Sequence, residues 1–164
     1  MYNEVNYLYC TGEDIDGDGL YDKNKEWQNL GNDIAGTQYD VAYVMWGGSW
    51  VMPSEEQQLE LLNNCTYEWT TLNGVYGNKF ISKTNGVSIF LPAAGYFYDS
   101  YIQVQGAGEG GIYWSSTQDP SRAYNAYHLY FDSGWPDWYY YDNRHCGQSV
   151  RPVVSKLMHL FRTR

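Results

Sequence analysis

Residues 69–92 read Trp69-Thr-Thr-Leu-Asn-Gly-Val-Tyr-Gly-Asn-Lys-Phe-Ile-Ser-Lys-Thr-Asn-Gly-Val-Ser-Ile-Phe-Leu-Pro92. Short strand-like runs alternate here with two Asn-Gly pairs, Asn73-Gly74 and Asn85-Gly86. Asn and Gly tolerate the positive φ angles that tight hairpins require, so the stretch predicts consecutive antiparallel strands. Pro92 ends the last run, because proline has no amide hydrogen to donate to a neighbouring strand.

Strand-like segments continue toward the C-terminus at 113–117, 126–131, 135–141 and 149–154, and one helix is predicted before them. Ser54 is a candidate N-cap, Gln57 completes a capping box, and Leu59, Leu61 and Leu62 give the apolar face. The pattern indicates an α+β fold, mainly short antiparallel strands with long loops and one or two helices. We expect a core of large apolar residues: Trp46, Trp50, Leu59, Leu62, Trp69, Phe90, Leu91, Trp114 and Val150.

The composition excludes several classes of function. The 164 residues contain 10 Lys and Arg against 19 Asp and Glu, which gives a net charge of −9. A nucleic-acid partner is not expected, because phosphate binding needs clustered cations. Membrane insertion is not expected either, since the chain has no apolar run of about 18 residues. The three cysteines, Cys10, Cys65 and Cys146, have neither zinc-site nor disulfide-scaffold spacing, so we expect buried or free thiols, with one long-range bridge as the alternative.

The N-terminal part of the chain contains an acidic loop with EF-hand-like spacing. Four aspartates occupy positions 1, 3, 5 and 9 of such a loop, Gly19 occupies the turn position, and a backbone carbonyl occupies position 7. Position 12 departs from the pattern, because Lys25 stands where a bidentate glutamate is typical. The loop is interpreted either as a structural calcium site or as a solvated acidic turn. The predicted ligands are Asp14, Asp16, Asp18, Leu20 and Asp22.

No set of residues forms an enzyme signature. Ser115 or Ser116 could be combined with His128 and Asp132, but neither serine lies in a G-x-S-x-G elbow. His128 is expected to be a strand residue that faces solvent. His145 and Cys146 are adjacent, and adjacent strand residues point to opposite faces. The glycine-rich run 106–111 precedes a strand and not a helix, which argues against nucleotide binding. We therefore expect a non-enzymatic protein.

Segment 118–145 is rich in Tyr, Trp, Asn, Asp and His. Tyrosine and tryptophan offer large contact area with few rotatable bonds, and the polar residues offer adaptable hydrogen bonds, as in an antibody paratope. The segment is interpreted as a recognition surface, with 96–101 as an additional candidate part of it and with strand alternation sending about half of the rings inward.

Eight motifs in order resemble the Fibrobacter succinogenes major paralogous domain family. They are Ile34-Ala-Gly-Thr-Gln-Tyr-Asp40, Trp46-Gly-Gly-Ser-Trp-Val-Met-Pro-Ser54, Glu60-Leu-Leu-Asn-Asn-Cys65, Glu68-Trp-Thr70, Asn85-Gly-Val-Ser-Ile-Phe-Leu-Pro-Ala-Ala-Gly95, Tyr113-Trp-Ser-Ser-Thr117, Tyr130-Phe131 and Gly147-Gln-Ser-Val-Arg-Pro-Val153. The resemblance implies a C-type-lectin-like fold over 29–154, preceded by a strand and acidic loop in 1–28 that pack on it, and followed by a basic tail, 155–164.

Members of that family are mostly secreted or surface-attached proteins of Bacteroidetes-type bacteria. The resemblance thus implies an extracytoplasmic domain whose signal or anchor lies outside this chain. The related formylglycine-generating enzymes use a pair of cysteines near the C-terminal end, where this chain has only Cys146. A degenerate relative of those enzymes is one alternative function, and a structural domain of a cell-surface assembly is another.

The chain also resembles the variable proteins of diversity-generating retroelements, which place a mutable binding surface at the C-terminal end of this fold. That resemblance implies variable contacts at Asn125, His128, Pro136, Asp137, Tyr139, Tyr140, Asp142, Asn143 and His145, with Trp135 and Trp138 fixed. The leading hypothesis is an adhesin-like module that binds a protein or glycan ligand. Its predicted contacts are Asn125, His128, Trp135, Asp137, Trp138, Tyr139, Tyr140, Asp142, Asn143 and His145.

Overall fold

The computed structural model describes residues 7–17, 20–98, 103–134 and 136–155, with the backbone alone for 136–140. These residues form two helices and ten strands, so the predicted α+β class is confirmed. The elements are β1 (Cys10–Glu13), β2 (Lys23–Trp27), α1 (Val41–Trp46), β3 (Trp50–Val51), α2 (Glu55–Asn64), β4 (Cys65–Leu72), β5 (Val75–Ser82), β6 (Ser88–Pro92), β7 (Gly110–Gln118), β8 (Asn125–Asp132), β9 (Pro136–Asn143) and β10 (Val153–Val154).

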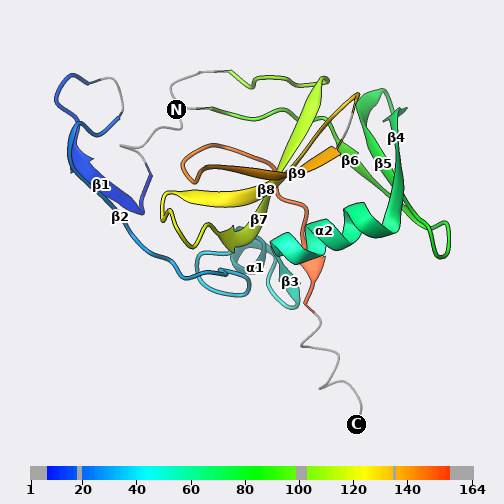
Figure 1. The fold of residues 1–164 in the computed structure, drawn as a ribbon, viewed down its shortest axis with the longest axis horizontal. Coiled ribbons are helices and arrows are strands. Elements are labelled where there is room, and N and C mark those ends of the chain that lie inside the picture. Colours follow the sequence, from blue (N-terminus) through cyan, green and yellow to red (C-terminus); the bar gives the residue numbers. More distant parts are fainter. Residues whose placement is uncertain (1–6, 18–19, 99–102, 135, 156–164) are drawn as a thin grey trace, which may run out of the picture.

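Two three-stranded antiparallel sheets form the body of the molecule, β4-β5-β6 and β7-β8-β9 (Figure 1). The turn between β4 and β5 is the predicted Asn73-Gly74 pair, with φ angles of 52° and 80°. Two consecutive positive φ angles define a tight hairpin turn whose twist matches that of the strands. The prediction of consecutive antiparallel strands in this region is confirmed.

Helix α2 begins as the sequence predicts and packs beside both sheets (Figure 1). The Ser54 hydroxyl accepts a hydrogen bond from the Gln57 amide, and the Gln57 side chain accepts one from the Ser54 amide. This reciprocal capping box satisfies two amides that a helix start leaves without partners. The buried Gln58 side chain donates to the Tyr113 carbonyl at 2.9 Å, which ties the helix to β7.

The short helix α1 was not predicted, and its surroundings correct two expected core positions. Asp40 is fully buried and caps the helix by accepting hydrogen bonds from the amides of Ala42 and Tyr43. Trp46 and Trp50 contact each other edge to face, yet they are 61% and 41% exposed. Placing them in the core was wrong, because α1 buries only Ala42 and leaves its other side chains on the surface.

Sheet β7-β8-β9 has two faces with different coverings. On the core face, Tyr113, Leu129 and Phe131 join the main apolar cluster, which also contains Phe80 and Leu91. Leu62 and Trp69, two further predicted core residues, pack against this cluster while only partly buried. Successive residues of a strand point to opposite sides, so the outer face carries the paired residues Trp114 and His128.

The N-terminal hairpin β1-β2 lies against the outer-face side of that sheet, at the left of Figure 1. Trp27 stacks on His145 with ring centroids 6.0 Å apart and also contacts the Tyr124 ring. The Arg144 guanidinium donates to the Gln28 carbonyl at 2.9 Å. These contacts join the hairpin to Tyr124 and to the turn that follows β9.

All three cysteines are thiols, with Cys10 and Cys146 buried and Cys65 half-buried.

Over the described residues, neither helix is long and apolar enough to cross a membrane.

Candidate functional site

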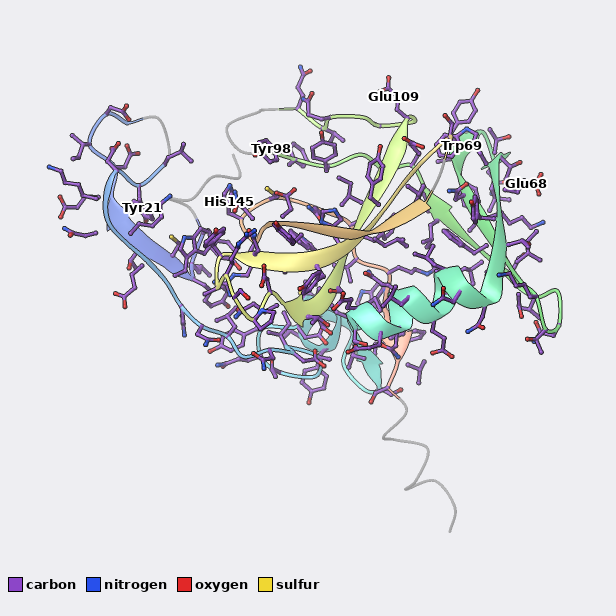
Figure 2. All side chains as sticks on the ribbon, in the orientation of Figure 1. Tyr21, Glu68, Trp69, Tyr98, Glu109 and His145 are labelled. Atoms are coloured by element: carbon purple, nitrogen blue, oxygen red, sulfur yellow. The ribbon has the colours of Figure 1, made fainter. Side chains whose placement is uncertain are left out.

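A polar cleft of 420 Å³ lies where the glycine-rich loop meets the hairpin between β8 and β9. We call it the hairpin pocket. Gly106, Gly110 and Ile112 line it together with five polar side chains. These are two tyrosines, Tyr96 and Tyr130, two carboxylates, Glu109 and Asp132, and one hydroxyl, that of Ser133. Figure 2 shows Glu109 at the beginning of β7, on the edge of the molecule that contains the loop residues 93–98 and 103–109. The volume of the hairpin pocket is within the range of small-ligand sites in proteins.

Strand pairing brings the pocket residues together from distant parts of the chain. Gly110 pairs with Asp132 at the open end of β7-β8, which places Glu109 beside the β8-β9 hairpin. Asp132 accepts hydrogen bonds from the Tyr130 hydroxyl at 3.1 Å and from the Gly134 amide at 2.7 Å. These bonds fix the carboxylate and one ring of the pocket in a defined orientation.

Gly95 fixes the position of the side of the pocket that Tyr96 forms. Its φ is 68°, and a Cβ atom there would lie 2.1 Å from the Gln105 carbonyl oxygen. Only glycine permits this close approach. The amide of Tyr96 then donates to that same Gln105 carbonyl at 3.0 Å, so the Tyr96 ring is held against the glycine-rich loop.

The structure places three predicted contact residues inside the protein. Asn125, His128 and His145 are only 4%, 5% and 4% exposed. The expectation that His128 faces solvent was wrong, because it lies on the outer face of the sheet, packed edge to face against Trp114 at 5.8 Å. Burial lowers the pKa of His128 to about 4, so its imidazole is neutral at physiological pH.

Asp142 and Asn143 are half-buried at the end of β9. Asp142 accepts hydrogen bonds from the Asn143 amide at 2.8 Å and the Gln148 side chain at 3.1 Å. Burial raises the pKa of Asp142, while hydrogen bonds from Asn143, Cys146 and Gln148 and the charge of His145 oppose that shift. Asp142 therefore connects β9 to the segment that follows it.

The remaining predicted contacts belong to β9 and the hairpin before it. Asp137, Trp138, Tyr139 and Tyr140 lie in β9, where the structure describes the backbone and not the side chains, and Trp135 lies outside the described residues. The backbone of β9 pairs with β8 over its length, with a bulge between the Tyr130 and His128 pairings. The hairpin pocket therefore lies directly beside the segment with most of the predicted contacts.

Sequence reasoning named the segments that contain Tyr130, Asp132 and Ser133 but did not select these residues, and it missed Glu109. The alternation of β8 was the available signal, because residues 130 and 132 point to one side of the strand. Glu109 had no such signal, because its position depends on the register between β7 and β8.

The acidic loop brings together three of its predicted ligands. Ligand atoms of Asp14, Asp16 and Asp22 all lie within 4.8 Å of one another. Asp14 accepts a hydrogen bond from the Gly17 amide at 2.7 Å, and Asp22 accepts one from the Ile15 amide at 2.8 Å. These bonds curl the loop around its carboxylates, as an oxygen-rich cation site requires. Asp18 lies outside the described residues.

Leu20, whose carbonyl is the fifth predicted ligand, is a half-buried bend residue of the same loop. The Asp22 amide donates to the Glu13 carbonyl at 2.8 Å, and this bond closes the loop between β1 and β2. Lys25, at position 12, is an exposed residue of β2, so this position supplies no carboxylate. The residues present fit a hard cation with fewer protein ligands than a complete EF-hand provides.

The serine, histidine and aspartate considered for catalysis are not arranged as a triad. His128 and Asp132 are four residues apart in one strand, about 13 Å at the usual rise. The Ser115 hydroxyl donates to the Tyr127 carbonyl at 2.8 Å. His145 and Cys146 occupy the turn after β9, where both are buried, and not a strand.

Comparison with known proteins gives one family. Residues 67–153 match the family described as a domain of unknown function, DUF8237. The chain belongs to this family. The DUF8237 region runs from β4 to β10 and contains every residue of the hairpin pocket, whereas the acidic loop and both helices precede it. No curated protein and no solved structure matches the chain.

Proposed function

We propose that this protein is a ligand-binding, adhesin-like module whose ligand is a glycan or protein bound at the hairpin pocket and the neighbouring β8-β9 segment. The observation that carries the proposal is the pocket itself, in which two tyrosine rings converge with two carboxylates at a polar loop edge. Functional contacts commonly lie on loops that a rigid scaffold positions. Here the two sheets and their shared core supply that scaffold.

The chemistry of the pocket favours a glycan over an apolar ligand. Carboxylates accept charge-assisted hydrogen bonds from hydroxyl groups, and such bonds are stronger than neutral ones. Tyr96 and Tyr130 add rigid, amphipathic surface at low cost in conformational entropy. A ligand rich in hydroxyl groups with one apolar face satisfies both features.

The C-type-lectin-like fold and the relation to the Fibrobacter succinogenes major paralogous domain family are part of this proposal. The arrangement that supports them is one well-formed helix followed by short antiparallel strands with long loops between them. An extracytoplasmic location at a cell surface follows from the same relation. The proposal extends to diversification of the binding surface by a retroelement. A search of the neighbouring genome for a reverse transcriptase gene beside a near-duplicate of the 3′ coding segment would test it.

We also propose that the acidic loop binds calcium in a structural role. The convergence of Asp14, Asp16 and Asp22 supports this proposal, together with the EF-hand-like spacing of the loop. An ion there would stabilise the β1-β2 hairpin, because it would join the two ends of the loop between the strands.

Binding is favoured over the two alternatives. A degenerate formylglycine-generating-enzyme-like activity would need an accessible thiol at Cys146, which is 4% exposed. A purely structural role in a cell-surface assembly offers no reason for the carboxylates and rings of the hairpin pocket to converge. We therefore propose a protein without catalytic activity.

A glycan array tests the proposal, with a protein array as a second arm. The double variant Tyr96→Ala/Asp132→Asn should lose at least tenfold in capture while its melting temperature stays within a few degrees. Tyr43→Ala, at an exposed tyrosine of α1, is the matched control and should retain capture. A triple variant, Tyr139→Ala/Tyr140→Ala/Asp142→Ala, tests the neighbouring strand. Full capture by both multiple variants would overturn the proposal.

A further inference from the structure

A second cavity, of 250 Å³, lies on the opposite side of the β7-β8 strands from the main core. We call it the aromatic cavity. Its walls come mainly from four parts of the chain: residues 7–9, residues 30–41, β7 with the beginning of β8, and residues 144–150. Of the described residues, none lines both this cavity and the hairpin pocket, so the two are separate sites.

The walls of the aromatic cavity are largely apolar and flat. Tyr9 and Tyr39 meet edge to face with ring centroids 5.2 Å apart on the side of the N-terminal segment. Trp114 lies opposite on β7, and its indole nitrogen donates to the Cys146 carbonyl at 3.3 Å, which fixes the ring. Met52 and Val150 also line the cavity. Such walls suit a flat, apolar ring.

One cation, Arg144, lies at this cavity, and no anionic partner contacts it among the residues that the structure describes. Arg144 donates from one terminal nitrogen to the Gln118 side-chain oxygen and from the other to the Gln28 carbonyl, both at 2.9 Å. Its guanidinium also lies over the rings of Tyr7 and Trp27. All of these partners are uncharged, and none of the described residues that line the cavity is Asp or Glu.

Polar atoms at the cavity wall have hydrogen-bonding capacity that the protein does not use. The Arg144 Nε atom is buried and has no hydrogen-bond partner among the described residues. The same holds for the hydroxyl of Ser116, a residue only 2% exposed, and for the side-chain oxygen of Gln148. A buried polar group without a partner costs about 1–3 kcal/mol. A ligand oxygen that accepts from the Arg144 Nε atom and the Ser116 hydroxyl would recover part of that cost, whereas the Gln148 oxygen needs a ligand donor.

The residues that carry the two unused donors, Ser116 and Arg144, line the same cavity. Ser116 and Gln118, two residues apart in β7, both line the cavity. Gln118 in turn holds the Arg144 guanidinium. The cavity therefore combines a buried hydroxyl and a cation with the rings of Tyr9, Tyr39 and Trp114.

We propose that the aromatic cavity binds a small monocarboxylate that carries a single flat, apolar ring. The carboxylate would pair with Arg144 and accept from Ser116, and the ring would lie between Trp114 and the tyrosines of the N-terminal segment. A guanidinium prefers a carboxylate, because its donors match the two oxygens of that group. The cavity is slightly smaller than a typical drug-sized site of about 300 Å³ or more, which limits the ligand to about one ring.

Tyr7 and Tyr9 belong to the segment that leads into the β1-β2 hairpin, so the cavity is completed by packing of the hairpin on the sheet. A bound ligand would touch both the hairpin side and the sheet side. The ligand should therefore stabilise their association by mass action.

The test uses three probes with the full chain: benzoate, benzamide and acetate. Benzoate has both ring and charge, benzamide has the ring without the charge, and acetate has the charge without the ring. Titration followed by NMR, read at the Trp114 indole N–H, should show benzoate binding at least tenfold tighter than either other probe. Equal binding of benzoate and benzamide, or no binding of benzoate at millimolar concentration, would overturn the proposal without any variant.

Variants then locate the site. Arg144→Met keeps the length of the side chain and removes its charge, and it should abolish the preference for benzoate over benzamide. Arg122→Met is the matched control, because Arg122 is an exposed arginine over Tyr141 that does not line the cavity. Ser116→Ala should weaken benzoate several-fold and serves as the second variant if Arg144→Met does not fold. Unchanged benzoate affinity in the folded variants would place the ligand elsewhere and overturn the assignment.

Discussion

The amide of Met52 donates to both carboxylate oxygens of Asp40, at 3.2 and 3.0 Å, across twelve residues of sequence. Asp40 is fully buried, and it also accepts from the amides of Gly36, Ala42 and Tyr43. One carboxylate thus serves as helix cap for α1 and as acceptor for the chain that follows β3. It holds together the region on which α2 begins.

The first prediction concerns this carboxylate. Asp40→Ala should lower the free energy of unfolding by about 3 kcal/mol, because four buried or half-buried amides lose their acceptor. Asp33→Ala is the control, since Asp33 is exposed and its carboxylate accepts from the Ala35 amide, two residues away. Urea unfolding followed by circular dichroism measures both. Equal losses in the two variants would mean that Asp40 acts only as a local turn residue.

The second prediction follows from the buried imidazole of His128. Its pKa is lowered from 6.5 to about 4 by burial. The unfolded chain binds a proton in that interval and the native protein does not, so stability is lost as the pH falls from about 6.5 toward about 4. Between about pH 7 and about pH 5 this group alone should lower the free energy of unfolding by about 2 kcal/mol.

His128→Phe isolates that effect, because phenylalanine keeps a ring against Trp114 and does not titrate. Urea unfolding of both proteins at the two pH values gives the comparison. Other groups, Asp142 among them, contribute equally to the two proteins and cancel. An identical pH dependence in the variant would show that His128 is protonated in the native state at pH 5.

The third prediction concerns attachment of the hairpin. Trp27 contacts Tyr7, Tyr124 and His145, so Trp27→Ala should release β1-β2 from the sheet while the remaining domain stays folded. Limited proteolysis should then cut the variant near residue 28 at least tenfold faster than the wild type. Trp46→Ala removes an exposed tryptophan and should leave the cleavage rate unchanged. Slow cleavage of Trp27→Ala would mean that other contacts suffice to hold the hairpin.

The fourth prediction concerns calcium. Millimolar calcium should raise the melting temperature of the wild type by several degrees, because the ion binds the folded loop and not the unfolded chain. Asp16→Asn should abolish the shift, since it removes one of three converging carboxylates. Glu56→Gln, at an exposed residue of α2, should keep it. Titration calorimetry without heat, together with no thermal shift, would identify the loop as a solvated turn.

Much of the local structure could be predicted from sequence, because the relevant interactions span a few residues. The capping box of Ser54 and Gln57 and the turn at Asn73-Gly74 depend on side chains and φ angles within four residues. The spacing of the acidic loop likewise predicted the cluster of Asp14, Asp16 and Asp22. Helix α1 was missed because its cap, Asp40, is stabilised by Met52, which is distant in sequence.

The candidate sites were only partly predictable. Glu109 reaches the hairpin pocket through the pairing of Gly110 with Asp132, and no local sequence pattern predicts the register between these two strands. His128 and His145 look like surface residues in a polar, tyrosine-rich segment, yet neighbouring parts of the fold bury them. Arg144 becomes a cavity residue only because it reaches Gln118 on β7 and Gln28 beyond β2.

The sequence by itself determined where the chain turns, where α2 begins and where carboxylates cluster, because backbone dihedral preferences and capping act between near neighbours. Tertiary structure alone decided which face of β7-β8-β9 is covered, and hence which polar side chains are buried and which line a cavity. Strand alternation assigns residues to two faces but does not say what packs on either, since that depends on elements that are distant in sequence.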